Sequence, residues 1–363
     1  MLTRIENRQL AHILVLFLIV QFGGMLLASL LFSTAQASAL TGSGTSTISS
    51  ASQTFYYFGS IIIFALLLVL LIRFYKGELL FILLEALAVV LPSFFFFLII
   101  LGYLFPSADF NPIAVASILL AVLLIYAKNK RPSLRNGVVV ISSIGLGVIL
   151  GISFGFAAAF LFMGLIAIYD YVAVFITKHM ITFAKALSSR NLAFLISASD
   201  IEVESQSSLH GKYGAVYKKH LVEMRKIDNP TIQRLIKSGQ IPIIAQIQLG
   251  AGDLGLPLML AVSAYSVLAN YFLSFVIIFG GAAGLIATML FLRKYMRPLP
   301  AIPPLFAFIC IALGLALPFT SVSNLPLSIL LIAAGVFIVV FVMYLTLRMG
   351  LRADRQKPAQ NKS

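Results

Sequence analysis

The chain has 363 residues, of which 60% are hydrophobic and only 10% are charged. Soluble domains carry about 25% charged residues, so this composition excludes an ordinary soluble protein. A net charge of +14 would suggest a nucleic-acid partner in a soluble chain, but the positions of the basic residues explain it without one. The sequence therefore predicts an all-α, polytopic transmembrane helix bundle with the lipid bilayer, and no nucleic acid, as its partner.

Apolar runs recur along the whole chain, and each is long enough to cross a bilayer as a helix. The first run also has the basic start and small-residue end of a secretory signal, but its apolar stretch is longer than such signals have. We therefore predict a retained first span among about ten in total. In chain order the predicted spans are 10–32, 55–73, 79–104, 111–127, 137–153, 154–177, 241–268, 270–292, 299–318 and 325–347.

The basic residues alternate with these spans. All 26 Lys and Arg residues fall before the first span or in the segments that follow spans two, four, six, eight and ten. The segments that follow spans one, three, five, seven and nine contain no Lys or Arg. The positive-inside rule then places both termini in the cytoplasm of a multi-pass protein of the cell membrane. Most of the net charge reflects this orientation, with some attraction to anionic lipid.

The spans and loops divide the chain into four parts. The segment 33–54 is rich in Ser, Thr, Gly and Ala, which predicts a flexible external loop. In the long cytoplasmic loop, residues 214–227 and 229–239 could form short helices. The four parts are 1–178 with spans one to six, the 179–240 cytoplasmic loop, 241–348 with spans seven to ten, and a basic cytoplasmic tail, 349–363.

Three carboxylic acids fall inside predicted spans, namely Glu85, Asp170 and Asp253. An ionised Asp at mid-bilayer costs about 2.5–3.5 kcal/mol, and with every Lys and Arg assigned to a cytoplasmic segment no span holds a cation to offset it. These acids must therefore be protonated, share protons or face water. Asp170 and Asp253 lie at similar depths on antiparallel spans, so we expect a close pair. We interpret Glu85 as protonated and hydrogen-bonded to a neighbouring helix, although it could also line the same cavity.

The sequence "GAGD", Gly250 to Asp253, places this acid among residues with almost no side chains. Such a face allows another backbone, from a helix or a substrate, to come close to Asp253. A helix-packing seam that carries one incidental acid would look the same. Pro257 leaves the Asp253 carbonyl without its helical donor, because proline has no N–H.

A second irregularity is "RPLPAIPPL", residues 297–305, where four prolines open span nine. We expect no regular helix here. Irregular backbone at membrane depth is tolerated only where it is buried in protein or lines a wet cavity. The segment is either a simple turn or a backbone edge able to hold an extended peptide.

Three motifs together resemble a known family. "YD" (Tyr169–Asp170), "GAGD" (Gly250–Asp253) and "PAI" (Pro300–Ile302) are similar to the YD, GxGD and PAL motifs of presenilin-type intramembrane aspartyl proteases. The string from 169 to 187 is especially similar to the archaeal presenilin homologues. The resemblance covers spans one to nine, which implies a nine-span core plus one C-terminal span of unassigned role. Ile302 stands where the family has Leu, a small change in shape.

The resemblance implies an intramembrane aspartic endopeptidase in which Asp170 and Asp253 form the catalytic dyad. Its substrates would be transmembrane helices of other proteins, and it would need no cofactor, no metal and no accessory subunit. The direction of span six matches presenilin, which implies substrates with external N-termini. The resemblance also assigns supporting and substrate-binding roles: Tyr169, Gly250, Ala251 and Gly252 would support the dyad, and Pro300, Ala301 and Ile302 would shape the substrate cleft.

A secondary transporter is the competing class, because its spans also hold intramembrane carboxylates. Transporters are usually built from internal repeats, and neither "GAGD" nor the proline cluster has a counterpart in the first half of the chain. The four histidines are scattered without ligand spacing, so we expect no metal site. Cys310 lies in an apolar run, where a lone thiol behaves as a small hydrophobe.

Overall fold

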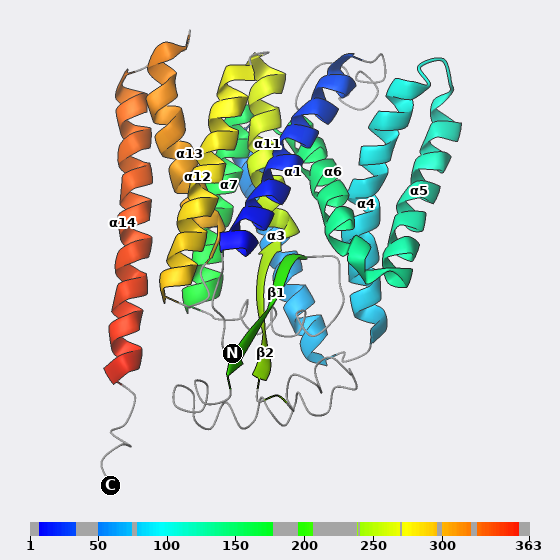
Figure 1. Ribbon diagram of the computed structural model, residues 1–363. Helices are drawn as coiled ribbons and strands as arrows, with labels where there is room; N and C mark the ends of the chain where they lie inside the picture. Colours follow the sequence, from blue (N-terminus) through cyan, green and yellow to red (C-terminus); the bar gives the residue numbers. More distant parts are fainter. Residues whose placement is uncertain are drawn as a thin grey trace.

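The computed structural model describes residues 7–33, 50–74, 78–176, 195–205, 238, 240–268, 271–295, 300–320 and 325–355. Within them, long helices stand side by side and a two-stranded hairpin lies at one end (Figure 1). The elements are α1 (Asn7–Ser33), α3 (Ala51–Phe74), α4 (Glu78–Leu104), α5 (Phe110–Lys130), η1 (Pro132–Leu134), α6 (Arg135–Ser153), α7 (Phe156–Tyr171), η2 (Val172–Ile176), β1 (Leu195–Ser205), β2 (Gln240–Gly250), α11 (Ala251–Leu268), α12 (Tyr271–Tyr295), α13 (Ile302–Ala316), η3 (Leu317–Phe319) and α14 (Leu325–Arg355).

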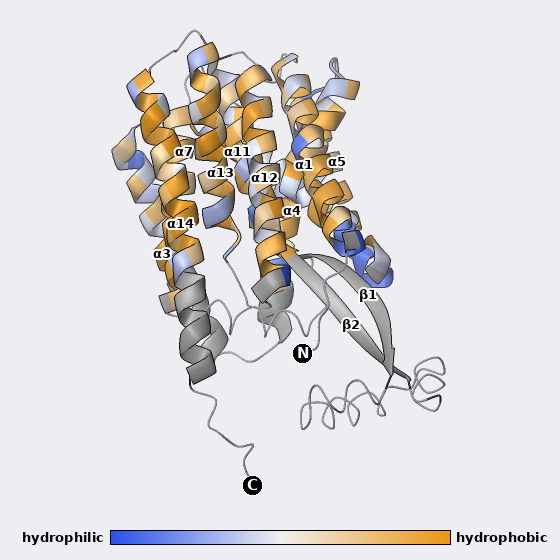
Figure 2. Cartoon of the chain, turned by 60° about the vertical axis from the view of Figure 1, so that its left-hand side comes forward, coloured by the Kyte–Doolittle hydropathy of each residue, from blue (hydrophilic) through white to orange (hydrophobic). Residues whose placement is uncertain are grey.

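The predicted polytopic helix bundle is confirmed. Eight helical segments in the described part of the chain are long and apolar enough to cross a membrane. Hydrophobic residues predominate along these helices (Figure 2), and many large apolar side chains are exposed, as a bilayer requires. The predicted break between spans five and six is also confirmed, since α6 ends at Ser153 and α7 begins at Phe156. The predicted short helices at 214–227 and most of 229–239, and the greater part of the predicted external loop 33–54, lie outside the described residues.

The prediction of span seven as 241–268 is wrong in its first part. Residues 240–250 form β2, which pairs antiparallel with β1, and the helix α11 starts only at Ala251. In Figure 1 the hairpin lies below the bundle and β2 runs up into α11. The sequence carried part of this signal, because Ala245, Ile247 and Leu249 alternate with Gln246 and Gln248. That period of two is typical of a strand, but a count of hydrophobic residues alone cannot separate it from a helix.

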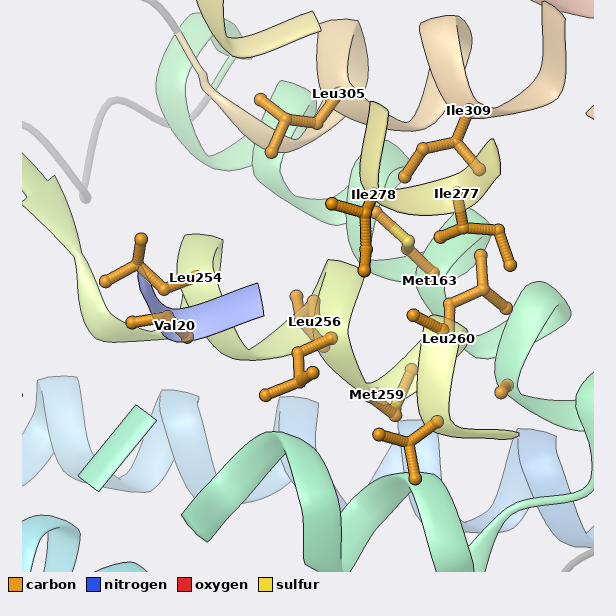
Figure 3. Close-up of a cluster of buried hydrophobic side chains, with 14 of the residues drawn as sticks. Val20, Met163, Leu254, Leu256, Met259, Leu260, Ile277, Ile278, Leu305 and Ile309 are labelled. Carbon is orange, nitrogen blue, oxygen red and sulfur yellow. The ribbon is translucent and has the colours of Figure 1, made fainter. Parts of the chain in front are cut away.

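Helix α11 lies at the centre of the bundle. It packs against α1, α6, α7, α12 and α13. Its side chains Leu254, Leu258, Met259 and Leu260 are completely buried. Figure 3 shows several of these residues among Val20 of α1 and side chains from α7, α12 and α13. The helix that carries Asp253 is therefore held from several sides.

Glycines on α6 let it approach the helices on both of its sides. A Cβ atom at Gly145 would overlap the backbone carbonyl of Pro92 on α4. On the other side, a Cβ at Gly151 would lie 2.6 Å from Val262 Cβ of α11. Small residues are what allow transmembrane helices to pack this closely. The α6 backbone therefore acts as a tight spacer between α4 and the central helix.

Helix α14, the predicted tenth span, packs along α13. A Cβ at Gly314 of α13 would lie 2.7 Å from Ile332 Cγ1, and one at Gly335 of α14 would lie 2.6 Å from Ile311 Cγ1. The glycines lie on both partners, so the two helices meet closely at two levels. Most of the other described side chains of α14 are apolar and exposed, as expected for a helix that faces lipid on its outer side.

The interpretation of Glu85 as a protonated acid without a cation is wrong. Lys128, close to the C-terminal end of α5, forms a salt bridge with Glu85 of α4. Both residues are buried, and Lys128 is only 1% exposed. The assignment of every Lys and Arg to a cytoplasmic segment missed this pair, because a lysine near a helix end has a long apolar stem that can carry its ammonium group into the bundle. The ion pair ties α4 to α5.

Candidate active site

Asp170 lies in the last turn of α7 and is 8% exposed. Its Oδ2 atom accepts a hydrogen bond from the backbone N–H of Ile302, at 3.4 Å. Directly after it, α7 changes into the π-helical segment η2, Val172 to Ile176. Such segments are frequent at functional sites. The local backbone thus singles out the position of Asp170.

The partner of Asp170 is the N-terminus of α13. Pro303 and Pro304 occupy the first turn of this helix and have no N–H. The Leu305 N–H donates to Ala301 O at 3.3 Å. The Ile302 N–H has no acceptor within α13 at this first turn, and it donates to Asp170 instead. A carboxylate at a helix N-terminus also interacts favourably with the helix dipole.

The expectation that regular helix cannot form among the four prolines is only partly correct. Pro300 and Ala301 are non-helical, but α13 begins at Ile302 and continues through Pro303 and Pro304. Prolines fit the first turn because the N–H groups they lack have no helical acceptor there. Pro300 and Ile302 are buried and Ala301 is partly buried. The PAI motif is thus the entry turn of the helix that contacts Asp170.

Asp253 is the third residue of α11 and is partly buried. Its Oδ2 accepts a hydrogen bond from the Gly250 backbone N–H, at 3.2 Å. This is the reciprocal half of a capping box, in which an acidic side chain in the first turn reaches back to the residue before the helix. Asp253 therefore sits at a helix start, and not twelve residues into a long span as the apolar run suggested.

The two aspartates are brought together from distant parts of the chain. α7 packs against both α11 and α13, and the carboxyl groups of Asp170 and Asp253 are close enough to interact electrostatically. Within the described residues no hydrogen bond joins the two carboxyl groups directly; each accepts a different backbone N–H.

The glycines around Asp253 have different roles. A Cβ at Gly252 would meet nothing within 4 Å, and Gly252 is exposed. A Cβ at Gly250 would lie 3.2 Å from Asp253 Oδ2, and one at Gly255 would lie 3.3 Å from Leu146 Cδ2 of α6. Gly255 therefore belongs to a helix-packing seam, whereas Gly252 leaves open space beside the acid. The packing seam expected from the sequence is present at Gly255, and the approach of another backbone beside Asp253 stays a prediction.

Two tyrosines flank Asp170. Tyr169 is partly buried and interacts electrostatically with Asp170. Tyr171 packs its ring against Phe175 at 5.1 Å and against Phe341 of α14 at 5.7 Å, measured between ring centroids. The tenth helix thus contacts the turn that carries Asp170, a contact that the sequence did not predict.

Sequence reasoning also missed two polar side chains that bind the first turn of α11. Gln21 of α1 donates its Nε2–H to Leu254 O at 2.9 Å, and Ser143 of α6 donates to Ala251 O at 3.4 Å. Gln21 is completely buried. A single glutamine inside the apolar run of span one was the available signal, because polar residues within membranes are costly and often functional.

The described residues contain no group of three or more His, Cys, Asp or Glu side chains that could hold a metal ion. The chemistry available at this site is that of two carboxyl groups, each held by a backbone N–H at a helix start.

The fold and the site together define a polytopic membrane protein with two carboxyl groups on neighbouring helices at the centre of the bundle. Residues 14–319 match the family described as signal-peptide peptidase, presenilin aspartyl protease. The chain therefore belongs to this family, and it is an intramembrane aspartic endopeptidase. Helix α14 lies beyond the matched residues.

Solved structures have the same fold. The chain is similar to a presenilin family intramembrane aspartate protease in a C222 crystal form, with a TM-score of 0.55 and 20% identity over 86% of this chain and 99% of that one. A P2 crystal form of a presenilin family intramembrane aspartate protease gives a TM-score of 0.52 and 18% identity over 85% of this chain and 96% of that one. No curated protein matches the chain.

Proposed function

We propose that Asp170 and Asp253 are the catalytic dyad and hydrolyse peptide bonds within the transmembrane helices of other membrane proteins. The observation that carries this proposal is the convergence of two carboxyl groups from α7 and α11 at the N-terminus of α13. Neighbouring carboxyl groups titrate as a pair that holds one proton between them. The pair then offers both a base and an acid, which is what hydrolysis of an amide requires.

In the proposed reaction the ionised member takes a proton from a water molecule, whose oxygen attacks the scissile carbonyl carbon. The protonated member donates its proton to the carbonyl oxygen, which gives a tetrahedral diol. The C–N bond then breaks as the amide nitrogen receives a proton from the dyad and one diol hydroxyl returns its proton to the dyad, leaving a carboxylic acid and an amine. The N–H of Ile302 and the N–H of Gly250 hold the two carboxyl groups in place throughout.

The substrate helix must unwind locally so that its peptide bond reaches the dyad. The space beside Gly252 and the non-helical backbone at Pro300 and Ala301 adjoin the two carboxyl groups. β2 ends at Gly250, three residues before Asp253, and it pairs with β1 along one edge. Its other edge has no strand partner among the described residues, which suits an extended peptide that adds by backbone hydrogen bonds.

The positions of the basic residues support a presenilin-like orientation in the cell membrane, with both termini cytoplasmic. In that orientation α7 runs from outside to inside. We propose that the enzyme prefers single-pass substrates whose N-termini are external, and that it acts without accessory subunits. The four-part division of the chain, with the 179–240 segment as a cytoplasmic loop, belongs to the same proposal.

The proposal is tested with the full chain reconstituted in liposomes together with a single-pass substrate in either orientation. Mass spectrometry of the products should show cuts inside the apolar segment of the substrate whose N-terminus corresponds to the external side. Cuts confined to the soluble flanks would exclude intramembrane proteolysis. Cuts only in the opposite orientation would overturn the proposed topology.

The variant Gly252→Val tests whether the open space beside Asp253 holds substrate. A Cβ atom there meets nothing within 4 Å, and Gly252 is exposed, so we expect thermal stability close to that of the wild type. We expect KM to rise by about tenfold or more, because the added carbon atoms occupy space that the substrate backbone needs. Gly255→Val is the contrasting variant: its side chain would press on Leu146, so it should lower the melting temperature. An unchanged KM in Gly252→Val would show that the substrate does not approach from this face.

A further inference from the structure

The most unusual polar group outside the dyad is Gln21, in the middle of α1. Its side chain is completely buried among apolar residues. The Nε2–H group donates to Leu254 O of α11 at 2.9 Å. The other end of the carboxamide, Oε1, is buried and has no hydrogen-bond donor within the described residues. A backbone carbonyl can only accept hydrogen bonds, so the carboxamide must face Leu254 with its NH₂ group. Its Oε1 atom is then left without a hydrogen-bond donor.

The first turn of α11 needs support that the helix itself cannot provide. Pro257 lies within α11 and lacks the N–H that would bind the carbonyl of Asp253 four residues earlier. The turn that carries Asp253 is therefore attached to the rest of its helix by fewer hydrogen bonds than usual. Gln21 binds the carbonyl of the next residue, Leu254, and so ties this weakened turn to α1.

The position of Gln21 relative to α11 is closely determined. A Cβ at Gly24, three residues later on the same face of α1, would overlap Leu258 of α11. On the same face, Phe17 is completely buried, and its Cζ would lie 3.3 Å from a Cβ at Gly281 of α12. Because α1 cannot slide past α11 without a clash, the carboxamide reaches the carbonyl of Leu254 in a definite place.

Stability alone does not account for a glutamine here. A buried carbonyl oxygen without a donor destabilises the fold, and an apolar side chain of similar size would fill the same space without that cost. Residues that break a local rule of this kind are expected at functional sites. Gln21 destabilises the fold through its unpaired Oε1 but binds the turn that holds Asp253. We infer that its role is to hold this turn in place.

We propose that Gln21 is a positioning residue that orients Asp253 toward Asp170 through its hydrogen bond to Leu254 O. This inference rests on the proposed proteolytic function of the two aspartates. Gln21 touches neither carboxyl group in the described structure, so its effect is transmitted by the backbone of the first turn. Misplacement of a reacting group by about 1 Å can cost about 100-fold in rate.

The test uses the full chain and the variant Gln21→Met, which keeps the length of the side chain and removes the amide. We expect kcat to fall by about 10- to 100-fold, with KM within about twofold of the wild type because the substrate-binding surface is intact. Hydrogen exchange supplies a readout that needs no substrate. Amides in the peptide 251–258 should exchange faster in Gln21→Met, while the C-terminal half of α11 keeps its protection.

Ser274→Ala is the matched control, because Ser274 of α12 is completely buried and donates to Ala261 O of the same helix α11 at 2.8 Å. This bond lies eight residues beyond Asp253, so its loss should lower thermal stability without a change in kcat. The inference is overturned if Gln21→Met keeps the wild-type kcat and exchange pattern. It is also overturned if both variants lose kcat in proportion to their stability. Cleavage that persists in Asp253→Asn would instead contradict the proposed function.

Discussion

Replacing either Asp170 or Asp253 by Asn is expected to abolish proteolysis, with kcat reduced by about 10⁴-fold or more. Asn has nearly the shape of Asp, but it can neither take a proton from water nor pass one to the leaving nitrogen. In the proposed dyad the two carboxyl groups act as one unit, so each single variant should lose about as much activity as the double variant. The measurement is the yield of cleaved single-pass substrate, quantified by mass spectrometry with purified protein.

The matched control for this experiment is Asp109→Asn. Asp109 precedes α5, is exposed, and makes no side-chain capping hydrogen bond, so its replacement should leave both cleavage and stability unchanged. The melting temperatures of all variants show whether lost activity reflects unfolding. Retained cleavage in a well-folded Asp170→Asn or Asp253→Asn variant would contradict the dyad.

The variant Lys128→Met is expected to lower the free energy of unfolding by about 3–5 kcal/mol. It removes the ammonium group that faces Glu85 in a site where both side chains are buried. A buried charge that loses its counter-ion is far more costly than the intact pair is stabilising. The measurement is the unfolding free energy in detergent micelles from a denaturant titration.

Two further variants make this result specific. The double variant Glu85→Gln/Lys128→Met should recover most of the lost stability, because no isolated charge remains. Lys130→Met changes a lysine on the same helix that is exposed and lies 4.8 Å from the centre of the Tyr126 ring, and should cost only about 0.5–1 kcal/mol. If Lys128→Met behaved like Lys130→Met, the pair would not be the tie between α4 and α5.

The three acids within the bundle have different kinds of partner. Asp170 and Asp253 are offset by backbone N–H groups at helix starts, whereas Glu85 is offset by a lysine. A carboxyl group held by neutral donors near a second acid can exchange its proton during a reaction. One that forms a buried salt bridge with a lysine ties two helices together instead. This difference separates the proposed catalytic acids from the structural one.

Much of the bundle could be predicted from the sequence because hydrophobic length is a direct physical requirement for crossing a bilayer. The ends of α1, α4 and α6 lie within a few residues of their predicted limits. The start of α11 could not be predicted in this way, because β2 is apolar enough, despite Gln246 and Gln248, to extend the apolar run of the helix. The alternating period was visible, but hydrophobicity summed over the run concealed it.

The site was predictable in part for a similar reason. Asp170 and Asp253 stand out because unpaired carboxylates inside apolar spans are costly. Glu85 met the same criterion, and only the fold shows that Lys128 reaches it. Gln21 and Ile302 act through hydrogen bonds to partners that lie 233 and 132 residues away in the chain. The local sequence pattern around a residue does not predict contacts over such separations.

The sequence by itself determined that this chain crosses the membrane many times and that two aspartates lie within its apolar segments, because the free energy of transfer into a bilayer is a property of each segment alone. The tertiary structure decided which polar groups face those aspartates: the N–H of Ile302 on Asp170, the N–H of Gly250 on Asp253, and Gln21 behind the turn of α11. The physical reason is that hydrogen bonds depend on the packing of helices from distant parts of the chain, and close packing of small residues sets that arrangement.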